Sequence, residues 1–446
     1  MQYLAALVAA LAATTTAAPV LDSRSFGTDL TALLKKIGIS IQTNSNSHGS
    51  LSGAITFTFP KVSLSLKRFV HEITWPKGCT EQAFMDWSTF KANGVNLGAW
   101  LEQERTHDPA WWDSHAPGTI DEWNFCAQLG NRCGTVLEER YATFITTSDI
   151  DKLASVGVNV LRIPTTYAAW VRVPGSNLYT GNQQKHLSKI VNYAIEKYNM
   201  HIIIGLHSLP GGVNSLDIGE GVGRYGWFNN ATNLDYSFQA VDAILAFIKG
   251  SGHINAFTVA PLNEASDTNL VGFGSAAGLT ANGTDWINTY VKGVLLKIAK
   301  LDKRIPLMLQ DCFEGPDYWA PFYDASTNLV IDSHVYYFAA SGVYSQYVAP
   351  AICGQAAALP GKGKFPVFVG EWALQTAYNN TFDSRKTIFD TQRYAWQKYA
   401  SGGAFWTARS LSTTAVDGEG IQEDYWSYIG LQEAGVITSQ TNSSYC

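Results

Sequence analysis

From residue 93 onward, short apolar runs alternate with longer segments whose apolar residues recur at helical spacing. Most of the short runs are continuously hydrophobic, as parallel strands covered on both faces require. Eight strand–helix repeats close a barrel more naturally than an open sheet, so the pattern predicts an α/β chain with a (β/α)₈ TIM barrel. The eight predicted strands span residues 94–100, 158–164, 201–208, 256–264, 305–311, 329–337, 366–372 and 403–408.

Two of the spacer segments carry clear helix signals. The segment 148–156 has helical periodicity and begins with Ser148, a residue type that caps helix N-termini. The segment 187–198 has apolar residues at helical spacing. Both are therefore predicted to be helices on the outside of the barrel.

The first 85 residues follow a different pattern. Residues 1–18 form a short apolar run ending in small residues, which predicts a signal peptide cleaved near Ala17 or Ala18 and a secreted, extracellular protein. That run is too short to span a bilayer. Residues 19–85 read as an N-terminal extension or propeptide, with an Asn/Ser-rich stretch at 43–53, one alternating strand at 54–59 and a dibasic pair, Lys67-Arg68, as its cleavage point. The barrel domain is expected to occupy residues 86–446.

The composition and charge of the chain indicate which kinds of molecule it can bind. The chain has 446 residues, is 13% aromatic and 15% charged, and carries a net charge of −6. Nucleic acid binding needs a basic face, and an anionic membrane surface needs one too, so both are disfavoured. A neutral substrate bound among aromatic rings by a monomeric protein fits the composition better.

The cysteines and the short sequence motifs indicate disulfides and no metal or dinucleotide cofactor. The six cysteines suggest structural disulfides, with Cys126–Cys133 the one pairing that the spacing favours. No Cys-x-x-Cys or His-Glu-x-x-His occurs, so no metal is expected. Residues 221–226 fit Gly-x-Gly-x-x-Gly, but they lie well past the third strand and open no helix, so no dinucleotide cofactor is expected. Four glycosylation sequons agree with secretion: Asn230, Asn282, Asn379 and Asn442.

Two predicted strands deliver a glutamate at their C-terminal ends. Glu264 closes the run 256–264, and Glu371 lies near the end of 366–372. Catalytic groups of TIM barrels sit at this end of the strands. Two carboxylates that face one sugar ring are the minimal machinery for splitting a glycosidic bond. The pair therefore predicts a glycoside hydrolase.

Further polar residues fall at the same strand ends and complete an ordered set. The set resembles glycoside hydrolase family 5, in its fungal exo-β-1,3-glucanase-like branch, from residue 93 to the C-terminus and on seven of the eight strands. The matching motifs are Gly94-Val-Asn-Leu-Gly-Ala-Trp100-Leu, Asp121-Glu-Trp, Leu161-Arg-Ile-Pro164, Leu206-His207, Leu262-Asn-Glu264, Asp332-Ser-His334-Val-Tyr336, Gly370-Glu371-Trp372 and Phe405-Trp406.

The resemblance implies a retaining mechanism, with Glu264 as the acid/base and Glu371 as the nucleophile. It also implies a substrate-binding role for each of the remaining strand-end residues. Among them, Arg162 and Tyr336 are expected to contact Glu371. Asn263 is expected to hold the sugar 2-hydroxyl. By the same resemblance, a terminal glucose would be bound partly by stacking on an indole. The implied substrate-binding residues are Glu104, Arg162, His207, Asn263, His334, Tyr336 and Trp406.

The substrate stays open between two interpretations. The resemblance favours an exo-acting enzyme on a β-glucoside or β-glucan. Departures from the exo-glucanase pattern favour a diglycosidase of the rutinosidase type (6-O-α-rhamnosyl-β-glucosidase), which removes a disaccharide from a flavonoid. Glu104 is followed by Arg105 rather than Pro-Trp, Glu264 by Ala265 rather than Pro, and the Gly-rich loop with Tyr225 and Trp227 is expected to form an extra pocket wall. A non-catalytic carbohydrate-binding barrel is the remote alternative.

Overall fold

The computed structural model describes the backbone of five short strands between residues 40 and 64, residues 83–340 and 342–439, and Cys446. The predicted signal peptide, the dibasic pair Lys67-Arg68 and the sequon at Asn442 lie outside the described residues. The chain divides into two units, Met1–Glu81 and Gln82–Cys446.

The described part of the first unit is antiparallel. β1 (Ser40–Ile41) pairs with β4 (Ile55–Phe59), which also pairs with β5 (Val62–Leu64). β2 (Asn44–Ser45) pairs separately with β3 (Leu51–Ser52). The alternating strand predicted at 54–59 is thus confirmed as β4.

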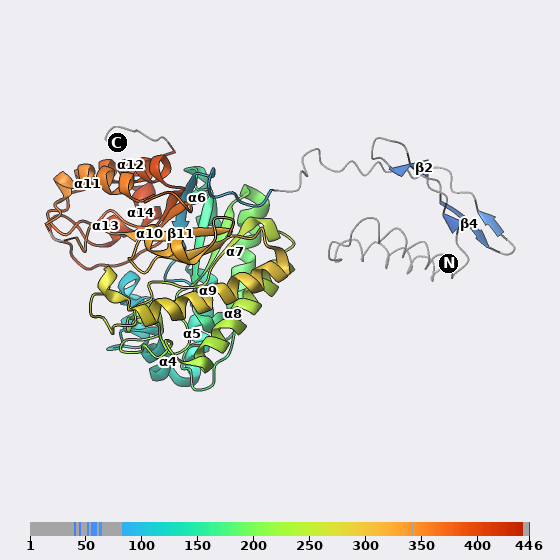
Figure 1. Cartoon of the computed structure of the whole chain (residues 1–446), viewed down its shortest axis with the longest axis horizontal. Coiled ribbons are helices and arrows are strands. Elements are labelled where there is room, and N and C mark those ends of the chain that lie inside the picture. Colours follow the sequence, from blue (N-terminus) through green and yellow to red (C-terminus); the bar gives the residue numbers. More distant parts are fainter. Residues whose placement is uncertain are drawn as a thin grey trace. The chain divides into compact units, whose positions relative to one another are not determined.

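The second unit contains a closed barrel of eight parallel strands, which confirms the predicted TIM barrel (Figure 1). The last strand pairs with the first, in the register Gly402↔Ala92 to Phe405↔Val95, and so closes the sheet. The strands are β6 (Ala92–Asn96), β7 (Val160–Thr165), β8 (His201–Leu206), β9 (Phe257–Ala260), β10 (Leu307–Gln310), β11 (Leu329–Val335), β12 (Val367–Trp372) and β13 (Gly402–Phe405).

Six of the eight predicted strands extend too far at their C-terminal ends, and the first and the fourth do so by four residues. The first was expected over 94–100 but ends at Asn96, because the chain turns at Ala99, whose φ is +53°. The fourth was expected to reach Glu264 but ends at Ala260. Pro261 follows, and a proline has no N–H to donate to a neighbouring strand.

Helices follow the strands around the outside, with α8 and α9 side by side (Figure 1). The helix predicted at 148–156 is α6, but its N-cap is Thr146, whose side chain and backbone form a capping box with Asp149, so the prediction of Ser148 as the cap is wrong. The helices are α3 (Pro109–His115), α4 (Glu122–Leu129), α5 (Cys133–Thr143), α6 (Thr147–Ser155), α7 (Gln183–Tyr198), α8 (Ala231–Gly250), α9 (Ala281–Asp302), α10 (Pro316–Trp319), α11 (Val348–Ala358), α12 (Phe382–Tyr399), α13 (Glu423–Trp426) and α14 (Tyr428–Glu433).

The barrel interior is filled by apolar side chains. Every strand contributes one residue to a buried cluster around Trp87, whose indole N–H donates to Thr258 Oγ1 at 3.0 Å. The strand residues of this cluster are Ala92, Val160, Ile203, Ala260, Met308, Val330, Phe368 and Ala404. Because side chains fill the barrel, a ligand cannot bind inside it, and we expect the binding site at the ends of the strands.

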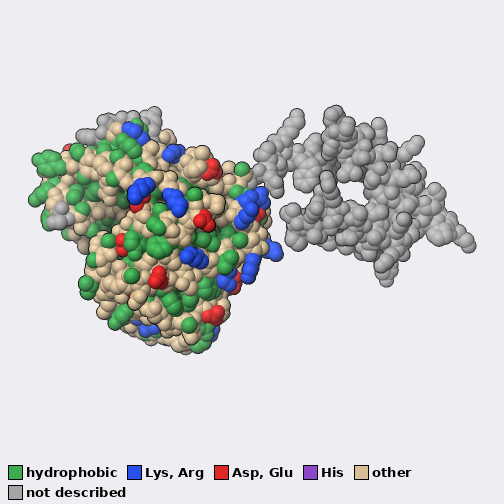
Figure 2. All heavy atoms as spheres, viewed as in Figure 1, with side chains coloured by type: hydrophobic (Ala, Val, Ile, Leu, Met, Phe, Trp, Pro, Cys, Tyr) green, Lys and Arg blue, Asp and Glu red, His purple; other side chains and the backbone are tan. Residues whose placement is uncertain are grey.

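The structure also shows the disulfides and the distribution of charge on the surface. The predicted Cys126–Cys133 bridge is confirmed, Cys353 is bonded to Cys446, and Cys312 is a buried free thiol. Acidic and basic side chains are intermixed on the face shown in Figure 2. Among the helices that the structure describes, none is both long and apolar enough to cross a membrane.

Candidate active site

Glu264 and Glu371 meet at the C-terminal end of the barrel. Both are buried, at 7% and 5% exposure, and one carboxylate oxygen of each lies within 4.8 Å of the other. Retaining glycosidases hold their carboxyl groups ~5–5.5 Å apart, whereas inverting enzymes keep them ~6.5–9.5 Å apart to admit a water. The short separation therefore has the retaining geometry.

Glu264 is held by its backbone as well as by its side chain. Its φ of +44° turns the chain after Pro261, its N–H donates to Gln310 Oε1 at 3.0 Å, and its carbonyl accepts from Asn214 Nδ2 at 3.0 Å. Left-handed backbone at a non-glycine residue is unfavourable and tends to occur at functional sites. The side chain is thereby aimed at the centre of the site.

Glu371 accepts from several donors. Arg162 Nη1 lies 2.8 Å from its Oε1, the Tyr336 hydroxyl donates to its Oε2 at 2.9 Å, and His207 Nε2 lies 3.5 Å from Oε1. Burial opposes ionisation, but the positive charges of His334 and Arg162 outweigh it and hold the pKa of Glu371 well below its ordinary value. Glu371 is therefore held in its ionised form.

Arg162 organises the centre of the site from β7. Its Nη1 also donates to Asn96 Oδ1 and its Nη2 to Asn263 Oδ1, each at 2.9 Å. Burial disfavours the charge, but Glu371 and Asp332 outweigh it and raise the pKa of the guanidinium. The Nδ2 of Asn263 is buried and has no hydrogen-bond partner among the described residues.

His334 connects the two glutamates. Its Nδ1 lies 2.6 Å from Glu264 Oε1 and 3.5 Å from Glu371 Oε2. Burial lowers the pKa of the imidazole, but the carboxylates of Glu371 and Asp332 outweigh burial and raise it to about 10. Nε2 lies 3.5 Å from Asp332 Oδ2 and 3.3 Å from Arg162 Nη2, so with the ring charged its proton points to Asp332 and the contact with Arg162 is not a hydrogen bond.

A cavity of about 310 Å³ opens beside the two glutamates. Trp406 forms one wall: its ring stacks on His207 at 5.4 Å and 11°, and its indole N–H donates to His107 Nε2 at 2.8 Å. Glu104 lies beside them at the wall. The lining residues include Glu104, His107, His207, Asp217, Ile218, Glu264, Tyr336, Phe338, Glu371, Trp406, Gln422 and Trp426. We call this cavity the sugar pocket.

Part of this pocket was missed from sequence. Trp426 stacks on Tyr336 at 5.4 Å, yet it lies in α13, beyond the last strand. The loop after β8 does contribute a wall, through Asp217 and Ile218. The expectation that Trp227 forms this wall is wrong, because its ring is fully buried against Tyr290. An aromatic residue alone did not distinguish a pocket wall from a core position.

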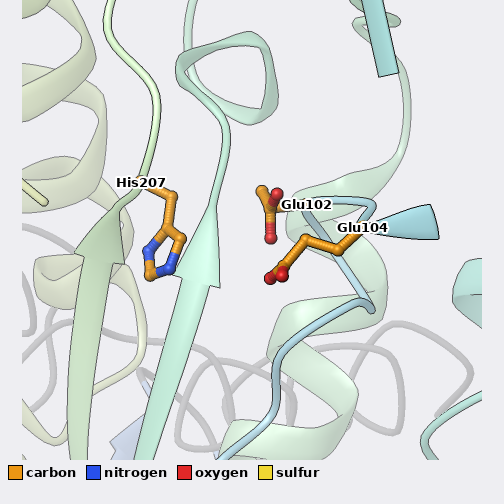
Figure 3. Close-up of side chains that lie close together, drawn as sticks. All are labelled: Glu102, Glu104 and His207. Carbon is orange, nitrogen blue, oxygen red and sulfur yellow. The ribbon is translucent and has the colours of Figure 1, made fainter. Parts of the chain in front are cut away.

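Two clusters contain residue types that bind metals: Glu264 with His334 and Glu371, and Glu102 with Glu104 and His207. In the first, Arg162 already neutralises Glu371, and the charge of His334 opposes a second cation. In the second (Figure 3), burial and the charge of Glu104 raise the pKa of Glu102 well above its ordinary value, which favours its protonated form over the charged form that a metal would need.

Comparison with known proteins agrees with this geometry. The crystal structure of rutinosidase from Aspergillus niger is 48% identical, with a TM-score of 0.78 over 80% of this chain and 100% of that one. The probable glucan 1,3-beta-glucosidase A of Aspergillus niger is 28% identical over 64% of this chain and 66% of its own length, so the chain spans slightly under two thirds of that relative. A GH5-4 broad specificity endoglucanase from Ruminococcus champanellensis, at 15% identity and a TM-score of 0.53, shares the fold.

The family model described as cellulase (glycosyl hydrolase family 5) matches residues 128–412, which include both glutamates and six of the seven other predicted site residues, all but Glu104. The short separation of Glu264 and Glu371 at the C-terminal end of the barrel is consistent with this match. The chain belongs to glycoside hydrolase family 5.

Proposed function

We propose that this protein is a retaining O-glycosyl hydrolase of the β-glucosidase type, which releases its glycone from the non-reducing end of a β-glucoside or β-glucan. The observation that carries the proposal is the pair of buried glutamates with oxygens within 4.8 Å, one of them ion-paired to Arg162. The two carboxyl groups have different partners, because Glu371 is ion-paired to Arg162 and Glu264 contacts His334, and we assign them different tasks.

In the first step Glu371 attacks the anomeric carbon, and Glu264 gives its proton to the departing glycosidic oxygen. A covalent glycosyl-enzyme forms, and the aglycone leaves. In the second step Glu264 takes a proton from water, whose oxygen attacks the anomeric carbon and releases Glu371. Two inversions leave the β configuration unchanged.

The exo action is supported by the pocket. Trp406, His107 and Glu104 line one wall of the pocket, and in the proposed binding mode they would stop a sugar chain from continuing past the terminal residue. A stacked indole and a carboxylate suit the faces and hydroxyl groups of a pyranose ring. A chain end therefore fits this cavity better than the middle of a glucan.

Proton NMR of the first product tests the retaining assignment. Hydrolysis of an aryl β-glucoside is expected to give the β anomer before mutarotation, and an initial α anomer would exclude the proposed mechanism. The same assay decides against a non-catalytic barrel, because saccharide binding without any hydrolysis at high protein concentration would favour that alternative.

A second candidate is a diglycosidase of the rutinosidase type. It is favoured by the 48% identity to the Aspergillus niger rutinosidase over the whole of that chain, against 28% to the glucan 1,3-beta-glucosidase A. Asp217 and Ile218, from the loop after β8, line the same pocket, and in this second reading they would contact a sugar beyond the first. Separate incubations with laminarin and rutin discriminate: glucose from laminarin supports the exo-glucanase, and intact rutinose from rutin with laminarin untouched supports the diglycosidase.

We further propose that the enzyme is secreted as a monomer and that residues 19–85 precede the catalytic barrel as a removable segment. The two disulfides and the mixed surface charge support an extracellular protein. N-terminal sequencing of secreted protein is the test: a start at Phe69 supports cleavage after Arg68, and a mature start at Pro19 rejects it.

A further inference from the structure

Glu102 lies behind Glu104 at the wall of the sugar pocket, and the reaction proposed above does not use it. Its side chain is 2% exposed. Its Oε2 and the Oε1 of Glu104 are both buried without a hydrogen-bond partner among the described residues. Figure 3 shows the two carboxyl groups close together, with Glu104 extended toward the ring of His207, and ligand atoms of the three residues lie within 4.8 Å of one another.

The surroundings of this pair are acidic. Besides Glu104, the carboxyl groups that act on Glu102 are those of Glu122, from α4, and Asp217, from the loop after β8. Burial also raises the pKa of Glu122 to about 8 and that of Asp217 to about 7. Carboxyl groups this close in a poorly solvated site cannot all ionise.

The two neighbouring histidines do not neutralise the pair. His107 Nε2 lies 3.5 Å from Glu104 Oε2, but it accepts the indole N–H of Trp406 and so carries no proton. The Nε2 of His207 lies 3.5 Å from the carboxylate of Glu371, to which its proton is directed. A proton held between the two glutamates is then the remaining way to reduce their repulsion.

We propose that Glu102 is a positioning residue, which as a neutral acid donates its proton to Glu104 and so holds the Glu104 carboxylate toward the hydroxyl groups of the bound sugar. The inference rests on the proposed function and adds a determinant of glycone binding to it. The pair behaves as one unit with one proton: Glu102 supplies the donor, and the Glu104 carboxylate supplies the acceptor for the sugar.

This arrangement makes glycone binding depend on pH. The functional form of Glu102 is the protonated one, and its pKa is raised in the folded protein, so binding is kept below that raised pKa and lost above it. Loss of the proton puts a second negative charge next to Glu104 and pushes its carboxylate away from the pocket. KM is therefore expected to rise at alkaline pH while kcat changes less.

The test compares Glu102→Gln with Glu102→Leu on an aryl β-glucoside. Glutamine keeps an N–H donor and does not titrate, so its KM at mildly acidic pH is expected within about threefold of wild type, whereas leucine removes a hydrogen bond to a charged group and raises KM roughly 10- to 100-fold. The alkaline rise of KM is expected to disappear in Glu102→Gln. It should persist in Glu139→Gln, the matched control, whose carboxyl group is exposed on α5 and lies outside the pocket lining.

Equal KM values for the glutamine and leucine variants, or an alkaline rise that persists in Glu102→Gln, would overturn the proposal. So would loss of wild-type activity on chelation with EDTA and its recovery with a divalent cation, because a metal would then replace the shared proton. An infrared difference spectrum between wild type and Glu102→Gln separates this inference from the proposed function: the C=O absorption of neutral carboxylic acids is expected to lose one component in the variant, whether or not any β-glucoside is hydrolysed.

Discussion

Arg162 and Glu371 lie 209 residues apart in the chain, yet their side chains form a buried ion pair of 2.8 Å across the barrel. Arg162 is 1% exposed and Glu371 5%. Because the pair is shielded from water and from salt, the guanidinium acts strongly on the ionisation of the carboxylate. The ion pair links the architecture of the barrel to the pH range in which the proposed nucleophile is charged.

Arg162→Lys is expected to move the acidic limb of kcat/KM to higher pH. Lysine keeps a charge but cannot reach Glu371, Asn96 and Asn263 together, so the pKa of Glu371 rises and the nucleophile is protonated at pH values where wild type is active. The pH profile on an aryl β-glucoside measures this shift. Arg172→Lys, at an exposed position, serves as the control, and an unmoved acidic limb in Arg162→Lys would contradict the assigned role.

Glu371→Gln is expected to reduce kcat by at least roughly 10³-fold, because an amide cannot form the glycosyl ester. The fold should survive, since glutamine has nearly the same volume and can still accept from Tyr336. Steady-state kinetics and thermal unfolding give the two readouts. Glu314→Gln, the same change at a partly exposed site after β10, should leave both unchanged; comparable turnover in the two variants would refute a nucleophilic role.

Glu264→Ala is expected to affect substrates according to their leaving groups. A poor leaving group such as an alkyl alcohol needs the proton of Glu264, whereas a dinitrophenolate departs without it. The ratio of kcat/KM values for the two glycosides should therefore increase in favour of the activated one. Added azide should restore turnover and give a β-glycosyl azide. Equal losses on both substrates would show that Glu264 is not the general acid.

Removing the Cys353–Cys446 bridge is expected to cost more stability than removing Cys126–Cys133. The first spans 93 residues and the second 7, and the chain-entropy model makes the longer loop more stabilising by about 2 kcal/mol. Denaturant unfolding of the two paired Cys→Ala variants measures the difference. Equal losses, or a larger loss for the short loop, would mean that local packing outweighs loop entropy here.

Much of the barrel could be predicted from sequence because each buried parallel strand is a short, continuous apolar run. Such a pattern cannot say where a strand stops. The runs 94–100 and 256–264 continue with apolar residues beyond their last ladder bonds, and a turn at Ala99 and the missing N–H of Pro261 end them. Tertiary geometry, rather than hydrophobicity, fixed these two boundaries.

The site was predictable where its residues follow strands and unpredictable where they come from loops. Glu264, Glu371 and Arg162 belong to ordered strand-end motifs. Asp217 and Trp426 line the same pocket from segments with no periodic pattern. Glu102 was missed for a different reason: one acidic residue next to another reads as an ordinary solvated surface until the fold shows both to be near the pocket wall and Glu102 to be buried.

The pairing of β13 with β6 has a consequence for how the enzyme is made. Asn96 on the first barrel strand donates to the carbonyl of Phe405, 309 residues later, and also accepts from Arg162. A ribosome must therefore release nearly the whole barrel before its seam can join, and contacts this distant in sequence form slowly. Until then Asn96 lacks its partner on β13 and the sugar pocket lacks Trp406. Catalytic competence therefore waits for β13, so a chain truncated before β13 should be an unassembled precursor rather than a weaker enzyme.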